Sequence, residues 1–173
     1  KKIKKKSTIP IILMGYINPI IKNGLSKFIH DCKSAEIDGL IIPDIPPEEC
    51  KKIRSLCIEN NISLIMLIAP NTSDERIKYI SNLSPDLVYC VSILGVTGTK
   101  KVENKNLINY LKRVKKNCNS PFIVGFGVKD SNEVKNINKI SNGAVIGSEL
   151  IRRISASKNP IEECYSFIKG LKK

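Results

Sequence analysis

Six short apolar runs alternate with amphipathic segments from one end of the 173-residue chain to the other. The runs are rich in β-branched and aliphatic residues at successive positions, as strands buried on both faces are. We predict strands at residues 9–15, 39–42, 63–68, 87–92, 122–126 and 144–146. Strands that alternate strictly with helices favour a parallel sheet with right-handed crossovers, so the sequence predicts an α/β fold.

The segments between the runs carry helical signals. Apolar residues recur at helical spacing in two of them, namely Leu25, Phe28, Ile29 and Cys32 in the first and Leu107, Tyr110, Leu111 and Val114 in the second. Pro47 is expected to open a helix, because proline is favoured in a first turn. Thr72 with Glu75, and Asp130 with Glu133, have the spacing of a capping box, so we expect helices to begin at Thr72 and Asp130.

Two parallel architectures fit this alternation. A doubly wound sheet commonly binds its ligand with a Gly-rich turn after the first strand, whereas a barrel places ligand groups at the C-terminal ends of many strands. The glycine-containing segments here follow late strands, which favours a (β/α)8 TIM barrel. Six units are two short of eight, and 173 residues are fewer than the roughly 200 to 250 of such a barrel. We therefore predict that residues 1–173 form the C-terminal part of a single barrel domain, about strands 3 to 8 with their helices.

Composition argues against several classes of function. The net charge of +13 is spread over every predicted helix and no recognition motif accompanies it, so we expect no nucleic-acid partner. The longest apolar stretch, residues 9–21, is interrupted by Gly15, Asn18 and Pro19, and we expect no membrane span. The six cysteines form no C-x-x-C pair and His30 is the single histidine, so we expect no metal site.

Glycines follow the last two predicted strands. Gly127 comes just after the fifth strand, and Gly147 and Ser148 come after the sixth. Such glycines let backbone N–H groups approach an anion, and a helix that starts at Ser148 would add a hydroxyl and a favourable dipole. Either motif alone is better explained by a tight strand-to-helix turn. Together, at matching strand ends, they favour a phosphate site where barrels commonly hold one.

Two further features at strand ends leave alternatives open. Residues 89–100 begin as a strand and end as a Gly-rich loop, which could close over a ligand and present Thr97, or could be an ordinary turn. Asp44 ends an apolar strand, where a carboxylate could act as an acid or a base.

Several motifs occur in the order and spacing found in one known family. They are residues 13–19 (LMGYINP), 38–49 (DGLIIPDIPPEE), 92–98 (SILGVTG), 125–127 (GFG) and the pair Gly147-Ser148. The run ending in GVTG, together with GFG, is highly specific, and the similarity spans nearly the whole chain. The chain resembles tryptophan synthase alpha subunits. Ile93 stands where many members have Arg, at a variable position.

The resemblance implies an activity in tryptophan biosynthesis, namely a lyase that cleaves indole-3-glycerol phosphate to indole and glyceraldehyde 3-phosphate without a metal or organic cofactor. It also implies a partner, the beta subunit of an α2β2 heterotetramer, in the cytoplasm or the plastid stroma. Breaking the carbon-carbon bond requires general acid-base catalysis. The family assigns that work to a Glu at the end of strand two and an Asp in the next loop. We expect both positions upstream of Lys1, so that no catalytic residue lies in this chain.

The resemblance also implies roles for individual positions. Thr97 is similar to the loop threonine that bonds the catalytic Asp on closure. The residues similar to the phosphate cradle are Gly98, Gly127, Gly147 and Ser148. Those similar to the substrate pocket are Met14, Tyr89, Phe126 and Asp44, with Asp44 in a supporting role rather than as the proton donor. The residues similar to the beta-subunit interface are Tyr16, Asn18 and Pro19.

Two other functions remain to be distinguished. Another phosphate-binding barrel enzyme would be expected to carry a catalytic Lys or Asp at a strand end, and no Lys lies inside a predicted strand. A catalytically incomplete chain could instead serve only as a module that binds the beta subunit. The coding sequence upstream of Lys1 would discriminate, because two more strand-helix units with a strand-end Glu would favour the enzyme.

Overall fold

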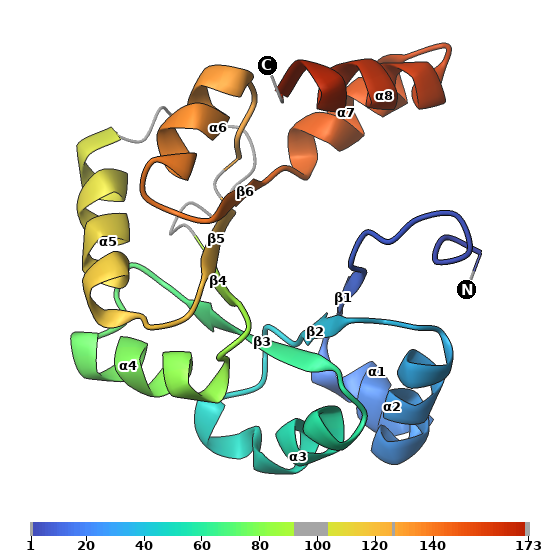
Figure 1. The fold of residues 1–173 in the computed structure, drawn as a ribbon, viewed down its shortest axis with the longest axis vertical. Helices are drawn as coiled ribbons and strands as arrows, with labels where there is room; N and C mark the ends of the chain where they lie inside the picture. Colours follow the sequence, from blue (N-terminus) through green and yellow to red (C-terminus); the bar gives the residue numbers. More distant parts are fainter. Residues whose placement is uncertain (1, 92–103, 126, 172–173) are drawn as a thin grey trace.

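A computed structural model describes residues 2–91, 104–125 and 127–171 as one parallel sheet with helices around it (Figure 1). The strands are β1 (Ile12–Met14), β2 (Gly39–Ile41), β3 (Ser63–Ile68), β4 (Val88–Val91), β5 (Phe122–Gly125) and β6 (Gly143–Val145). The helices are α1 (Ile17–Asn23), α2 (Leu25–Ser34), the 3-10 helix η1 (Pro47–Glu49), α3 (Lys51–Glu59), α4 (Asp74–Leu83), α5 (Asn104–Asn117), α6 (Ser131–Asn138), α7 (Ser148–Ala156) and α8 (Pro160–Leu171).

The sheet has the order β1-β2-β3-β4-β5-β6, and every neighbouring pair is parallel. Figure 1 shows the strands curving around a central space, with the helices on the outer side. Among the described residues β1 and β6 do not pair with each other, so the ring is open between them. The predicted α/β class is confirmed, and the curved sheet is an incomplete barrel.

The two faces of the sheet have different environments, because successive strand residues point to opposite sides. In β3, Leu64, Met66 and Ile68 belong to the buried cluster that packs under the helices. Ile65 and Tyr89 lie on the other face, which we call the inner face, and Tyr89 is only half-buried. The outer face therefore supplies the main core, and the inner face lines the centre of the ring.

The first strand is shorter than predicted, and Pro10 explains the difference. Proline has no N–H for the ladder, so pairing cannot extend regularly through it. The next amide, Ile11 N, donates instead to Asp38 Oδ2 at 2.6 Å. Lys4 Nζ lies 2.6 Å from the same oxygen, and this ion pair lowers the pKa of Asp38. Asp38 thus holds the segment before β1 against the start of β2.

One predicted helix cap is wrong and the other is right. Ser73, not Thr72, caps α4 by accepting from Arg76 N, whereas Thr72 Oγ1 accepts from Ala69 N in the preceding turn. Both hydroxyls were available, and the path of the turn decided between them. Asp130 caps α6 as predicted, accepting from Glu133 N at 2.9 Å. Pro47 opens η1, and α3 follows it.

Candidate functional site

Parallel strands end at one edge of their sheet, so the residues that follow them gather on one rim. Gly15 follows β1, Asp44 follows β2, Gly127 follows β5, and Gly147 with Ser148 follows β6. The predicted site residues Thr97, Gly98 and Phe126 lie outside the described residues. The remaining candidates can be placed on this rim or on the inner face below it.

The two late glycines stand at equivalent heights on neighbouring strands. Gly125 of β5 pairs with Val145 of β6, and Gly127 and Gly147 each lie two residues beyond that pair. Gly127 has a φ of +58°, a left-handed conformation that glycine adopts without steric cost, and it is exposed. Both glycines have open space where a Cβ would stand. The register thus places both glycines at one part of the rim.

Ser148 is the first residue of α7, and Gly147 is its N-cap. Ile151 N donates to Gly147 O at 3.0 Å, which starts the helical bonding. The amides before it, including that of Ser148, have no partner within the helix and can donate to an anion. The side chain of Ser148 is exposed beside them. This end of α7 has the chemistry of a phosphate-binding turn.

Glu149 also lies in the first turn of α7, but its negative charge is already paired. Arg152 Nη2 and Arg153 Nε each lie 2.7 Å from Glu149 Oε1. Hydrogen bonds from the two guanidinium groups lower the pKa of Glu149 to about 2. The carboxylate therefore faces its own helix rather than acting as a proton donor at the rim.

Tyr89 occupies the inner face next to a glycine. A Cβ built on Gly125 would lie 2.6 Å from Tyr89 Cζ and closer still to its hydroxyl oxygen. The phenol therefore fills the volume that a side chain at Gly125 would take. Burial raises the pKa of Tyr89 above its usual value, so the hydroxyl stays protonated near neutral pH and can donate a hydrogen bond.

One residue expected in the substrate pocket and three expected at the partner interface lie close together where β1 ends. Met14 ends that strand, pairs with Ile41 and is 60% exposed. Tyr16 is 66% exposed, and Asn18 and Pro19 are exposed in the first turn of α1. Their side chains are available to a ligand or to another subunit.

Asp44 does not stand free on the rim. Its Oδ1 accepts from Ile17 N at 2.9 Å, which links the segment after β2 to the start of α1. No spacing rule pairs residues 27 positions apart, so this bond could not be predicted from the sequence.

The sequence also did not predict the hydrogen bonds that two α5 side chains make to the end of β3 and the turn after it. The hydroxyl of Tyr110 donates to Ile68 O at 2.7 Å, and Arg113 Nη1 donates to Thr72 O at 2.7 Å. These α5 side chains fix the end of β3 and the turn after it. The helical spacing identified Tyr110 as a core residue, but spacing does not reveal where a hydroxyl will find its acceptor.

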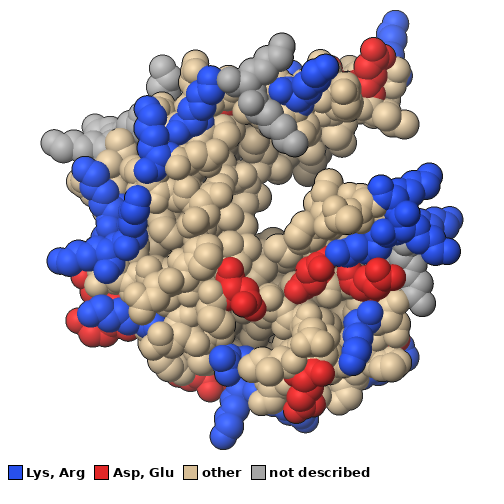
Figure 2. Space-filling model, viewed as in Figure 1, with Lys and Arg blue, Asp and Glu red and all other residues tan. Residues whose placement is uncertain are grey.

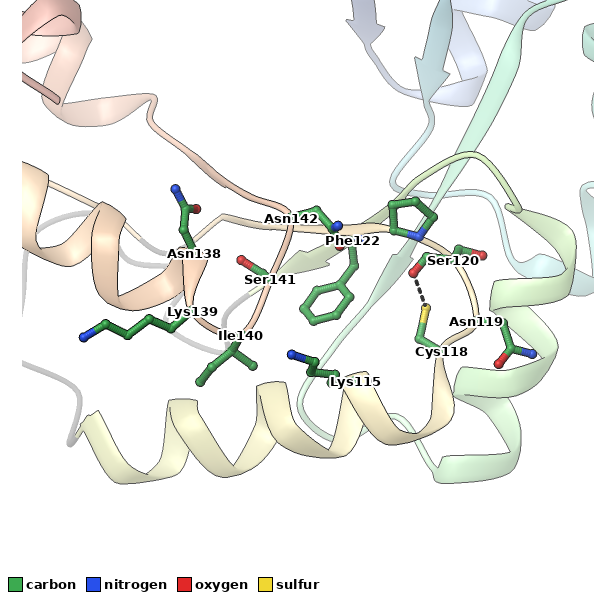
Figure 3. A pocket seen from close by; sticks show the side chains of 11 residues that line it. Lys115, Cys118, Asn119, Ser120, Phe122, Asn138, Lys139, Ile140, Ser141 and Asn142 are labelled. Carbon is green, nitrogen blue, oxygen red and sulfur yellow. Dashed lines mark hydrogen bonds between the residues drawn. The ribbon is translucent and has the colours of Figure 1, made fainter. Parts of the chain in front are cut away.

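A cavity of about 360 Å³ lies at the opposite end of the strands. Figure 3 shows side chains around it from the end of α5, such as Lys115, and from the α6–β6 connection, such as Lys139 and Asn142. Asn142 Oδ1 accepts from Phe122 N at 3.0 Å, so part of this lining is structural. The cavity is separate from the rim.

Basic and acidic side chains are placed differently on the face that Figure 2 shows, where several Asp and Glu side chains lie closer to the central hollow. On the face in view, Figure 2 shows Lys and Arg chiefly on the outer surface, away from the central hollow. Within residues 2–91, 104–125 and 127–171, no helix has the length and apolar character needed to cross a membrane. The same part of the chain holds no group of three or more His, Cys, Asp or Glu side chains arranged to bind a metal ion.

The sequence matches a family model described as Tryptophan synthase alpha chain over residues 1–172. The tryptophan synthase alpha chain of Pelodictyon phaeoclathratiforme is 42% identical over 91% of this chain and 61% of that protein. That of Petrotoga mobilis is 40% identical, over 98% of this chain and 67% of the relative. The chain spans about three fifths of the length of the first of these relatives.

Solved structures give the same result. A chain in a structure of the tryptophan synthase a2b2 complex from Pyrococcus furiosus superposes with a TM-score of 0.89 at 33% identity, covering 99% of this chain and 70% of that one. A mutant alpha-subunit from the same organism gives a TM-score of 0.87 at 32% identity, with coverage of 99% and 69%. The match along residues 1–172 and the shared parallel fold show that this chain belongs to the tryptophan synthase alpha chain family.

Proposed function

We propose that this chain serves the alpha-subunit reaction of tryptophan biosynthesis, the retro-aldol cleavage of indole-3-glycerol phosphate to indole and glyceraldehyde 3-phosphate. The observation that carries the proposal is that Gly127 and Gly147 each follow a strand end by two residues, on neighbouring strands paired at Gly125 and Val145, in a chain of this family. Amides at the start of α7, with the Ser148 hydroxyl, would hold the substrate phosphate. Gly98 would complete the cradle, and Thr97 would act when the loop closes.

The rest of the substrate would lie toward the inner face. Met14 would contribute a wall of the indole pocket, and Phe126 would lie beside the phosphate. Tyr89 would be near the reacting end, where its buried and protonated hydroxyl can donate a hydrogen bond. The reaction needs no metal or organic cofactor in this proposal.

Proton transfer would be carried out by carboxylates that are not among these 173 residues. The contacts of two acids at the rim, Glu149 and Asp44, support this assignment. Glu149 is paired with two arginines, and Asp44 accepts from the backbone of α1. In this scheme the chain binds and positions the substrate, while a Glu and an Asp outside it act on carbon 3 and the glycerol hydroxyl.

The partner would be the beta subunit of tryptophan synthase, as in the a2b2 complex of Pyrococcus furiosus. Tyr16, Asn18 and Pro19 would contribute to that interface. Their exposure where β1 ends supports the assignment. The narrower alternative, a chain that only docks the beta subunit, shares this surface and differs in predicting no affinity for the substrate.

The phosphate assignment is tested by titrating indole-3-glycerol phosphate and inorganic phosphate into the chain by calorimetry. Ser148→Ala should weaken both affinities about tenfold, because it removes a hydrogen bond to a charged group. Ser155→Ala is the matched control, since Ser155 is an exposed serine later in the same helix. Equal affinity in wild type and Ser148→Ala would contradict the phosphate site. Absence of any substrate binding by the wild type would favour the docking module.

A further inference from the structure

Asp44 supplies a helix cap from a neighbouring strand-helix unit. Helix α1 begins at Ile17, and its N-cap Tyr16 makes no capping bond with its own side chain. Asp44 Oδ1 accepts from Ile17 N at 2.9 Å instead. A carboxylate at this end of a helix satisfies a free donor and also favours the positive end of the dipole.

The first turn of α1 has few donors, which makes this bond more important. The first helical residues are Ile17, Asn18 and Pro19. Pro19 has no N–H, so only two of these three residues offer a backbone donor. Asp44 accepts one of the two.

Asp44 is itself held on a fixed backbone. Ile45 N donates to Ile42 O at 3.3 Å, which closes a turn with Pro43 and Asp44 at its centre. Ile42 is 3% exposed, and Ile45 packs against the core. Both ends of the turn are therefore anchored in the core, and the carboxylate projects from a turn with little freedom.

Tyr16 lies between two points of attachment, one to the last residue of β2 and one to the turn after it. On one side Gly15 N donates to Ile41 O at 3.1 Å, and on the other Ile17 N donates to Asp44. Tyr16 itself is 66% exposed. The two bonds fix the backbone on both sides of a side chain that projects from the protein.

We propose that Asp44 is a positioning residue for the beta-subunit interface. It holds the start of α1, and thereby Tyr16 and Asn18, in the arrangement that the partner binds. The inference rests on the proposed function for the identity of the partner. It assigns Asp44 no proton transfer and no contact with the substrate phosphate. Asp44 forms no ion pair within the described part of the chain, so its role there is the bond to the amide.

The test compares Asp44→Ala with Asp44→Asn, because the asparagine keeps an oxygen that can accept from Ile17 N. Three quantities are measured on the full 173-residue chain: affinity for the beta subunit of the same source, affinity for inorganic phosphate, and amide hydrogen exchange at Ile17. We expect Asp44→Ala to weaken beta-subunit binding and to speed exchange at Ile17, each about fivefold, which is the typical effect of losing a cap. Asp44→Asn should stay close to wild type, and phosphate affinity should be unchanged in both variants.

Asp86→Ala is the matched control. Asp86 is also an exposed carboxylate that accepts one hydrogen bond, from Ser63 Oγ at 2.6 Å, but it precedes β4 at the other end of the sheet. It should change neither exchange at Ile17 nor beta-subunit affinity.

Each other outcome overturns a defined part of the scheme. Unchanged exchange at Ile17 in Asp44→Ala would show that the bond does not hold the helix start. Faster exchange with unchanged beta-subunit affinity would show that Asp44 holds the helix start but does not affect binding of the beta subunit. Equal loss of affinity in the alanine and asparagine variants would show that the charge contacts the partner directly. If the wild-type chain does not bind the beta subunit, the proposed partner is wrong. The exchange data alone then decide whether Asp44 holds the start of α1.

Discussion

At the scale of single residues, Tyr89 and Gly125 share one volume on the inner face of the sheet. The tyrosine lies on β4 and the glycine on β5, and any Cβ at Gly125 would overlap the phenol. The conformation of Gly125 is not the constraint, because its φ is not in the left-handed region. Position 125 must instead lack a side chain because Tyr89 of β4 fills the space that a Cβ would take.

Gly125→Ala should therefore destabilise the chain by about 1 to 3 kcal/mol, the usual cost of forcing extra volume into a packed site. Urea unfolding measures the change. Replacing Tyr89 by Leu in the same chain should recover most of the loss, because the atoms that overlap are those of the phenol. If the two substitutions change the free energy of unfolding additively, the two residues do not compete for one volume.

Gly170→Ala is the control for this prediction. Gly170 lies in α8 with open space around its Cβ position, so alanine there should be neutral or stabilising.

At the scale of elements, α7 and α8 are joined by charged contacts. Among described residues α7 has no buried side chain, and α8 buries only Phe167. Arg153 joins the two helices, with Nη1 3.2 Å from Glu163 Oε1 and its guanidinium 4.4 Å from the centre of the Phe167 ring. Glu149 holds Arg153 from within α7. The packing of this pair should therefore respond to pH.

The folded-state pKa of Glu149 is about 2, below its ordinary value of 4.5. A carboxylate with a depressed pKa stabilises the fold above its unfolded pKa, and this stabilisation is lost as pH falls through the folded pKa. The difference in urea midpoint between wild type and Glu149→Gln should be constant above about pH 5.5 and shrink between pH 4.5 and 2. Glu59→Gln, on α3, is the control for a glutamate-to-glutamine change outside the α7–α8 pair. A midpoint difference that stays constant down to pH 2 would show that these ion pairs do not stabilise α7.

At the scale of the whole molecule, the open sheet determines what the chain can do by itself. Strands β1 and β6 each have a neighbour on one side only within the described residues, so each presents an edge of unpaired backbone groups. Exposed apolar side chains lie near one edge, including Ile12 and Met14 of β1. Such edges favour self-association, which ultracentrifugation of the isolated chain would detect.

We predict that the 173-residue chain alone releases no measurable indole from indole-3-glycerol phosphate. Losing a general acid or base costs roughly 10² to 10⁴-fold each, and the proposed mechanism places both carboxylates outside this sequence. Joining the chain to the N-terminal segment of a relative, such as the Petrotoga mobilis alpha chain, should restore turnover. Turnover by the isolated chain that Asp44→Asn abolishes would instead make Asp44 the catalytic carboxylate, and would also contradict its positioning role.

Local pattern was sufficient to predict most of the fold. The apolar runs predicted all six strands because burial on both faces requires continuous apolar residues, and residues 63–68 match β3 at both ends. Strict alternation with helices predicted parallel pairing, since a crossover is needed between parallel neighbours. The motifs at residues 13–19, 38–49, 92–98, 125–127 and 147–148 resemble tryptophan synthase alpha subunits, and the family match over residues 1–172 confirms that resemblance.

The sequence by itself determined the elements, their parallel order and the family, because each of these depends on periodicity or on residues close together along the chain. The tertiary structure alone decided which side chains meet. It placed Asp44 against the amide of Ile17 and the phenol of Tyr89 over Gly125. Those contacts depend on strand register and on the curvature of the sheet, which arise only when neighbouring strands pair.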